Sequence, residues 1–290
     1  FSNNLGRNRK FIKGDIVATI IQEYHAFSEK ITSLGLPIMM CGGETADIGD
    51  LVKTLVVDAS AFTIMRREDV IDASYIQNND VIIGLTSFGK ASYEDEYNSG
   101  IGSNGLTLAR HGTLSHEYYK KYPECYDQNL NEKYIFFGKY KLTDFINEIK
   151  STIGNALLSP TRTYTPIIIE ILKDLRKDIH GIIHNTGGGQ TKILKFGYNI
   201  KYVKNNLFKL PKIFEIIQTS SKTQWKEMYS TFNMGHRMEL LCHESIASEI
   251  IKIAKKYNID SKIIGYCEKS PRRGKNVLDI NSEFGSFNYD

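Results

Sequence analysis

The chain has 290 residues, of which 41% are hydrophobic and 24% charged, and its formal net charge is +4. That length suits one large or two ordinary domains, and the composition is typical of a soluble globular protein. The small positive charge favours anionic small-molecule substrates and gives no indication of nucleic-acid binding. No apolar run approaches the roughly 18 residues that a membrane-spanning helix needs, so we expect no segment that spans a membrane.

Four cysteines are spread along the chain, at Cys41, Cys125, Cys242 and Cys267. None lies close enough to another for a C-x-x-C pair, which argues against a zinc knuckle. Three of them end strand-like runs, where a buried free thiol is ordinary. Unpaired thiols fit a reducing compartment, and no signal-peptide segment is present, so we expect a cytoplasmic protein.

The first part of the chain predicts a small α/β unit. The expected elements are a helix at 15–34, a strand at 37–41 and a β-rich run within 53–65. The helix is amphipathic, and Gly35 ends it. Residues 66–79 are polar and rich in turn formers, so we place the domain boundary there. The predicted fold class is α/β, with two mixed α/β domains over residues 1–73 and 74–290.

The second domain is expected to open with a strand at 80–85. The further predicted elements are helices at 104–111, 164–176, 211–220 and 244–257, and strands at 179–183, 238–242, 262–266 and 277–280. Residues 86–103 form a long predicted loop, and its segment 90–98 is expected to be mobile because few apolar residues anchor it. The basic run 272–275 is expected to be a solvated hairpin loop.

Three consecutive glycines, Gly187–Gly189, follow His184 and Thr186 at the end of a predicted strand. Without side chains, their backbone N–H groups can approach a ligand closely, and such a nest favours an anion. A strand, a glycine loop and a helix start together are a common phosphate site. The alternative is a flexible turn with no ligand.

Two further glycine segments have a functional and a structural interpretation. In Gly42-Gly43-Glu44-Thr45-Ala46-Asp47, the carboxylates of Glu44 and Asp47 are the oxygen ligands that Mg²⁺ prefers, while a helix-capping turn is the alternative. Residues 100–105 match G-x-G-x-x-G but do not directly follow a strand, which excludes a dinucleotide-binding turn. Ser103, Asn104 and Gly105 then open a helix, which suits phosphate binding or N-capping.

A third segment, Pro160-Thr161-Arg162-Thr163-Tyr164, precedes a predicted helix. Arg162 could hold a phosphate with two hydrogen bonds and Thr161 could add a hydroxyl, whereas a surface arginine at a helix entry is the alternative. Residues 227–235 lack clean periodicity and are predicted to be loop and core. No Walker A motif occurs, so any ATP site must be of another kind.

These segments, in this order, resemble the phosphoribosylformylglycinamidine cyclo-ligase family, also called AIR synthetases. The family pattern contains G-G-E-T-A, S-G-x-H-S-N-G, P-T-R-x-Y, H-x-T-G-G-G and E-M-x-x-x-F-N-M-G. The matching positions are 42–46, 99–105, 160–164, 184–189 and 227–235. Five ordered matches over most of the chain are far more specific than any one of them.

The chain departs from the family pattern at several positions. Gly102 replaces the family histidine, residues 90–98 are an insertion, Gln190-Thr191-Lys192 replace the usual Asn and Arg, and His236-Arg237 follow Gly235. The family's Asp-Gly-x-Gly-Thr-Lys and Asn-Asp segments are expected upstream of Phe1. We therefore expect an incomplete N-terminal domain, and we expect this chain alone to lack cyclo-ligase activity.

The resemblance implies an ATP-dependent ring closure that converts formylglycinamidine ribonucleotide to aminoimidazole ribonucleotide in purine biosynthesis. It implies ATP and Mg²⁺ as cofactors, a homodimer, and neither nucleic acid nor membrane as a partner. The implied catalytic residues are His184 and Arg162, and the implied metal ligands are Glu44 and Asp47. The implied cofactor-binding residues are Ser103, Asn104, Gly105, Thr161, Thr186, Gly187, Gly188, Gly189 and Asn233. Another ATP-dependent enzyme, such as formylglycinamidine ribonucleotide synthase or a small-molecule kinase, and a non-catalytic ligand-binding fragment are the alternatives.

Overall fold

The computed structural model describes all 290 residues, which divide into two compact units. The first contains Phe1–Val70 and Tyr119–Asn131, and the second contains Ile71–Tyr118 and Glu132–Asp290. The boundary expected after residue 73 lies close to the break at Val70. Segment 119–131, which the sequence analysis assigned to the second domain, groups instead with the first, where Lys53 Nζ donates to the Tyr126 carbonyl at 2.6 Å.

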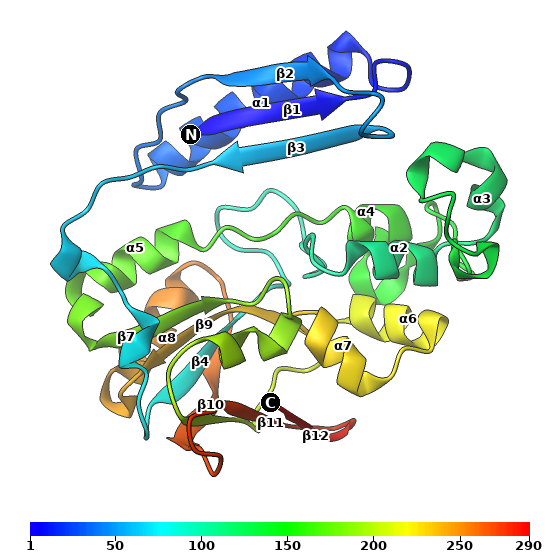
Figure 1. Cartoon of the computed structure of the whole chain (residues 1–290). Helices are drawn as coiled ribbons and strands as arrows, with labels where there is room; N and C mark the ends of the chain where they lie inside the picture. The colour runs from blue at the N-terminus through cyan, green and yellow to red at the C-terminus, as the bar shows by residue number, and fades with distance from the viewer. The chain divides into compact units, whose positions relative to one another are not determined.

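The first unit is a three-stranded sheet with one helix along it (Figure 1, blue). Its elements are β1 (Ser2–Arg7), α1 (Gly14–Ser33), β2 (Gly43–Asp47), β3 (Leu55–Ser60) and a 3₁₀ turn, η1 (Arg67–Asp69). The strand order is β2-β1-β3, with β1 parallel to β2 and antiparallel to β3. Leu5 of β1 and Val17 and Ile31 of α1 are buried, which confirms the predicted helix, although Ile16 and Phe27 of its expected apolar face are exposed.

The strand predicted at 37–41 is wrong, because this segment is irregular and strand β2 begins only at Gly43, two residues after the predicted strand ends. Pro37 has no N–H for a sheet ladder. Gly42 has a φ of +107°, which turns the chain so that Gly43 pairs with Asn3 of β1. A Cβ at Gly43 would overlap the Asn3 carbonyl oxygen, so the second glycine permits close strand pairing.

The second unit is built on a seven-stranded mixed sheet in the order β12-β11-β8-β10-β4-β9-β7 (Figure 1). The strands are β4 (Val81–Thr86), β7 (Ile179–His184), β8 (Ile200–Lys204), β9 (His236–Cys242), β10 (Ser261–Lys269), β11 (Val277–Ser282) and β12 (Gly285–Tyr289). A separate two-stranded ladder pairs β5 (Phe145–Ile146) with β6 (Ser151–Thr152). Every residue of β4 is buried, as expected for a central strand covered on both faces.

Helices surround this sheet. They are α2 (Leu106–Thr113), α4 (Ile153–Leu157), α5 (Thr165–Asp174), α6 (Lys212–Ser221), α7 (Trp225–Thr231) and α8 (Ala247–Lys256). A further helix, α3 (Glu117–Lys121), lies where the chain passes from the second unit into the segment that groups with the first. Helices α5 and α8 cover one face, where Ile167 and Ile250 pack in one core cluster with Ile83 and Leu240 of the sheet. The 3₁₀ helices of this unit are η2 (Ala73–Tyr75), η4 (Glu132–Tyr134), η5 (Asn147–Ile149), η6 (Arg176–Asp178), η7 (Gly189–Lys195) and η8 (Glu244–Ile246), and η3 (Pro123–Cys125) belongs to the first unit. No helix is both long and apolar enough to cross a membrane.

Two topological expectations are wrong. The basic run 272–275 is exposed but is not a hairpin loop, because β8 lies between β10 and β11 in the sheet. Residues 227–235 are not only loop and core, since they begin with most of helix α7. Cys242 and Cys267 are buried free thiols, whereas Cys41 is exposed although it follows an apolar run.

Candidate functional site

Three loops of the second unit meet at one edge of its sheet. Strand β9 runs antiparallel to β4 and to β7, so the start of β9 lies beside the ends of both neighbours. Thr86 pairs with His236, and His184 pairs with Met238. The loop after β4, the glycine loop after β7 and the turn before β9 are therefore neighbours, although they are far apart in the sequence.

Asn233 holds these loops together. Its Oδ1 accepts hydrogen bonds from Ser87 Oγ at 2.7 Å and from the Gly235 N–H at 3.0 Å, and its Nδ2 donates to the Gly100 carbonyl at 2.8 Å. The Gln190 side chain donates to the Asn233 carbonyl. Asn233 is buried, and its side chain is occupied by these contacts. The cofactor-binding role expected for Asn233 does not fit this geometry, which makes it a positioning residue.

A cluster of buried polar side chains contacts the same loops from within the sheet. Lys204 Nζ donates to Glu239 Oε1 at 2.6 Å and to Gln190 Oε1 at 2.8 Å, and the Asn185 amide donates to Glu239 Oε1 at 2.7 Å. Burial alone would raise the pKa of Glu239, but Lys204 and the hydrogen bond from His236 outweigh it and lower the pKa to about 2. The Glu239 carboxylate is thus ionised at neutral pH and paired with Lys204.

The three consecutive glycines have different local roles. Gly187 faces open space, and Gly188 has a φ of +99°. Gly189, with a φ of +49°, packs so tightly that a Cβ would lie 2.5 Å from the Phe232 carbonyl oxygen. The N–H groups of Gly187 and Gly188 donate to no group of the chain, whereas the Gly189 N–H donates to Thr186. Gly187 and Gly188 thus fit the predicted anion nest, and Gly189 maintains its packing.

A second set of unused donors lies in the loop before α2. The N–H groups of Gly102, Ser103, Asn104 and Gly105 donate to no group of the chain. Gly105, with a φ of +73°, is the N-cap of α2, and the Asn104 side chain donates to the Thr231 carbonyl. This segment therefore presents backbone donors at the positive end of a helix, as a phosphate site requires.

His184 and Arg237 are neighbours in this region. His184 is exposed at the end of β7, and partial desolvation together with the positive charges of Arg237 and Lys192 lowers its pKa to about 4. Its imidazole is therefore neutral at pH 7. Arg237 is 1% exposed and forms no ion pair, and its Nη2 donates to the Ile101 carbonyl at 2.7 Å. Its Nη1 is buried without a hydrogen-bond partner.

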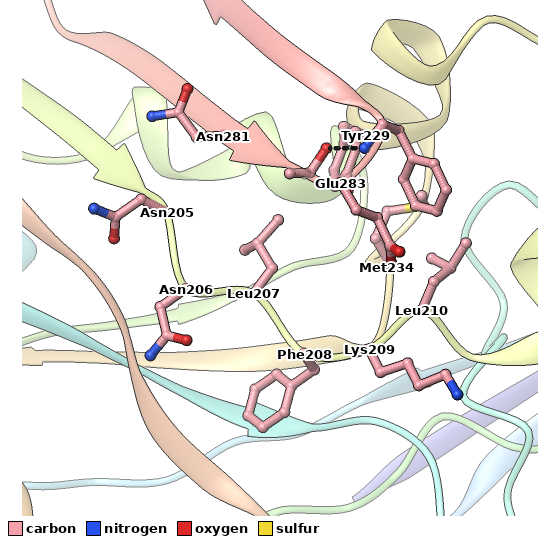
Figure 2. A pocket seen from close by; sticks show the side chains of 12 residues that line it. Asn205, Asn206, Leu207, Phe208, Lys209, Leu210, Tyr229, Met234, Asn281 and Glu283 are labelled. Carbon is pink, nitrogen blue, oxygen red and sulfur yellow. Dashed lines mark hydrogen bonds between the residues drawn. The ribbon is translucent and has the colours of Figure 1, made fainter.

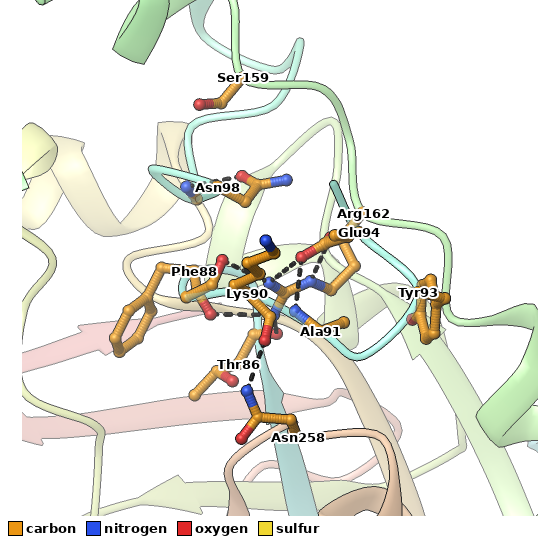
Figure 3. A network of polar contacts seen from close by, with 12 residues as sticks. Thr86, Phe88, Lys90, Ala91, Tyr93, Glu94, Asn98, Ser159, Arg162 and Asn258 are labelled. Atoms are coloured by element: carbon orange, nitrogen blue, oxygen red, sulfur yellow. Dashed lines mark hydrogen bonds and ion pairs between the residues drawn. The ribbon is translucent and has the colours of Figure 1, made fainter. Parts of the chain in front are cut away.

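The phosphate-binding role expected for Arg162 does not fit the structure (Figure 3). The guanidinium is buried, and its Nε and Nη2 form a two-pronged ion pair with Glu94 at 2.8 and 2.7 Å. Its Nη1 donates to the Thr86 and Phe88 carbonyls, and Nη2 also donates to Gly89. No N–H of the guanidinium remains for a ligand, so Arg162 fastens the loop after β4 to the sheet.

The same contacts bear on the segment 90–98, which was expected to be mobile. Its Ala91 is buried, its Asn98 donates to the Pro160 carbonyl at 2.9 Å, and its Glu94 pairs with Arg162. Polar anchors hold this loop where the sequence showed few apolar ones. Thr161, the other ligand expected from this motif, is half-buried between Pro160 and Arg162.

The two expected metal ligands do not form a common site within the first unit. Glu44 and Asp47 lie three positions apart in β2, so they face opposite sides of the strand. Glu44 lines a cavity with His25 of α1, whereas Asp47 lines another and accepts from the Arg9 N–H. No group of three His, Cys, Asp or Glu side chains is arranged to hold a metal ion. These residues do not fit a complete Mg²⁺ site.

A cavity of about 570 Å³ opens beside the candidate site (Figure 2). Its wall includes Tyr229 and Met234 from the segment that carries Asn233, and Phe208 from the loop after β8. Lys209 and Glu283 are its only charged lining residues, one of each sign. This balance does not favour anions, in contrast to the two loops with unused N–H groups.

Residues 77–275 match the family model described as AIR synthase related protein, C-terminal domain. The chain belongs to the AIR synthase related family. It is 30% identical to a phosphoribosylformylglycinamidine cyclo-ligase of Methanococcus vannielii, over 85% of this chain and 59% of that protein. It is 32% identical to the one of Methanocaldococcus jannaschii, over 79% of this chain and 56% of the relative. The chain thus spans little more than half the length of these relatives.

A solved structure of the hydrogenase maturation protein HypE resembles the chain with a TM-score of 0.52 and 12% identity. The match covers 100% of this chain and 75% of HypE, and it shows a shared mixed α/β fold. Within the AIR synthase related family model lie four of the five sequence motifs, at 99–105, 160–164, 184–189 and 227–235. Three of these four form the candidate site, and the fourth carries Arg162, which supports it.

Sequence reasoning missed three residues that shape this site. Glu94 lies in the insertion and neutralises Arg162, Gln190 joins two loops, and Arg237 adds a buried charge. Gln190 and Arg237 both lie at departures from the family pattern. These departures were the signal available in the sequence, because a residue that replaces a motif residue often contacts another replaced residue in the fold.

Proposed function

We propose that the full-length protein closes the ring of formylglycinamidine ribonucleotide with ATP, giving aminoimidazole ribonucleotide, ADP and phosphate. Support comes from the family and from relatives named for this reaction. The observation that carries the proposal is the pair of loops with unused N–H groups, Gly102–Gly105 and Gly187–Gly188, at one sheet edge. Substrate, ATP and products all carry phosphate groups, which such loops bind.

The chemistry needs positioning more than reactive side chains. The formyl oxygen becomes a good leaving group when the γ-phosphoryl group of ATP is transferred to it. The amidine nitrogen then attacks the carbon, closes the five-membered ring and expels phosphate. The two loops would hold the phosphate groups within reach of one another. His184, neutral at pH 7, would accept the proton that the attacking nitrogen loses. No step is assigned to Glu44 or Asp47, since their geometry does not form a metal site.

The experiment is an assay of the full-length protein with formylglycinamidine ribonucleotide, ATP and Mg²⁺, in which ADP and aminoimidazole ribonucleotide are both measured. We expect the two products in equal amounts. ADP without aminoimidazole ribonucleotide would indicate another ATP-dependent reaction. Binding of both substrates without ADP formation would indicate a non-catalytic ligand-binding protein.

A homodimer is part of the same proposal. Strand β3 of the first unit exposes Val56 by 46% on one face and Val57 by 40% on the other, which leaves an apolar side chain for a second copy on either face. Sedimentation equilibrium tests this directly, because a monomer at micromolar concentration would contradict it.

A further inference from the structure

Arg237 carries a buried charge that nothing in the chain neutralises. It is 1% exposed, it has no carboxylate partner, and its Nη1 has no hydrogen-bond partner. Taking a charge out of water costs several kcal/mol unless a counter-charge compensates it. Two other buried cations of this unit have a carboxylate partner: Arg162 pairs with Glu94, and Lys204 pairs with Glu239. Arg237 is therefore an exception within the same structure.

The position of Arg237 is linked to the glycine that replaces the family histidine. A Cβ added at Gly102 would overlap the guanidinium of Arg237. The arginine thus occupies the space that any side chain at position 102 would need. A histidine at 102 would therefore require the guanidinium of Arg237 to move, and we treat the two departures from the family pattern as one coupled exchange.

The guanidinium acts on the loop through a peptide group. Arg237 Nη2 donates to the Ile101 carbonyl at 2.7 Å, and the N–H of the same peptide belongs to Gly102. All peptide bonds of the chain are trans, so this N–H points away from the arginine. Hydrogen bonding to the carbonyl polarises the peptide and strengthens its N–H as a donor. That N–H is unused within the chain, like those of Ser103, Asn104 and Gly105.

We propose that Arg237 is the buried counter-charge of a phosphate group bound by the loop Gly102–Gly105. This inference rests on the phosphate-binding loop of the proposed function and adds the residue that charges it. The bound anion would neutralise the arginine, and the arginine would favour the anion through space and through the Ile101–Gly102 peptide. Arginine keeps its proton near neutral pH, so Arg237 itself adds no titration step to anion binding there.

The test uses inorganic pyrophosphate as the probe and calorimetric titration of the whole chain. Arg237→Met is expected to raise the dissociation constant about tenfold or more, as for loss of a charged hydrogen-bonding partner. Arg237→Lys keeps the charge and should bind within about threefold of the wild type. Arg273→Met, which removes an exposed charge from a distant loop, is the matched control. Unchanged binding by folded Arg237→Met would overturn the proposal.

The coupled exchange gives a second test that does not depend on the stability of one variant. Gly102→His alone should disrupt the loop, whereas Gly102→His combined with Arg237→Gly should fold and bind pyrophosphate below about pH 6.5, where histidine is charged. A folded double variant with no binding at low pH would contradict the proposal. Unfolding of every charge-removing variant, even with pyrophosphate present, would make Arg237 a folding residue only.

These binding measurements are separate from the proposed reaction. If the protein forms no aminoimidazole ribonucleotide, the proposed reaction is wrong, but the pyrophosphate measurements still decide the role of Arg237. Conversely, an active enzyme whose Arg237→Met variant binds pyrophosphate normally would keep the reaction and remove the counter-charge.

Discussion

Replacing Arg162 with methionine separates a supporting role from ligand binding. The variant removes the ion pair to Glu94, whose side chain is 16% exposed, and the donors to three backbone carbonyls (Figure 3). Breaking a buried pair by removing one partner costs about 3–5 kcal/mol. Glu94 keeps the Ala91 N–H and Thr86 keeps the Tyr164 hydroxyl, so we expect the lower part of that range.

The assay is urea denaturation of Arg162→Met, followed by circular dichroism. We expect the free energy of unfolding to fall by about 3 kcal/mol, while Arg273→Met on the exposed loop changes it by less than about 0.5 kcal/mol. Adding Glu94→Gln to Arg162→Met should restore part of the loss, because no unpaired carboxylate remains. Unchanged stability together with weakened pyrophosphate binding would refute this reasoning and return Arg162 to the ligands.

Three further predictions concern individual residues. Gly188→Val should weaken the binding of formylglycinamidine ribonucleotide and leave the circular dichroism spectrum intact, because a β-branched residue does not adopt a φ of +99°. Gly187→Ala, in open space, should keep wild-type stability, and normal binding by Gly188→Val would mean that the glycines form only a turn. His184 should titrate by NMR with a midpoint at about pH 4, and a midpoint near 6.5 would contradict its placement beside Arg237. Because the pKa of His184 is lower in the folded chain, the unfolded chain binds the proton more tightly, and the free energy of unfolding should fall as the pH drops from about 6.5 toward 4. Glu44→Ala in the full-length protein should leave folding and the Mg²⁺ concentration needed for activity unchanged, because Glu44 is exposed and belongs to no group of side chains arranged to hold a metal ion; a raised Mg²⁺ requirement would return it to the metal ligands.

Local patterns predicted most of the elements. The amphipathic helix at 15–34 and the strands at 80–85, 179–183 and 238–242 follow from periodicity and apolar runs, and the structure confirms their bounds within two residues. Strand order was beyond reach, because which strand lies between β10 and β11 depends on contacts distant in the sequence.

The site residues divide in the same way. Glycine spacing indicated the loops with unused N–H groups, since the glycine requirement is local. The roles of Arg162 and Asn233 could not be predicted, because a buried arginine that bonds carbonyls and one that bonds phosphate look alike in sequence. Only the position of Glu94, 68 residues away along the chain, decides between them.

The most direct test of the account is a titration of the isotope-labelled chain with formylglycinamidine ribonucleotide, followed through its backbone amide resonances. The account predicts that the largest shifts occur at Gly102–Gly105 or at Gly187 and Gly188, whose N–H groups have no partner in the chain. Amides buried in the sheet, such as those of β4, should change little. Saturable binding with shifts confined to other regions, or no binding at millimolar ligand, would contradict the account.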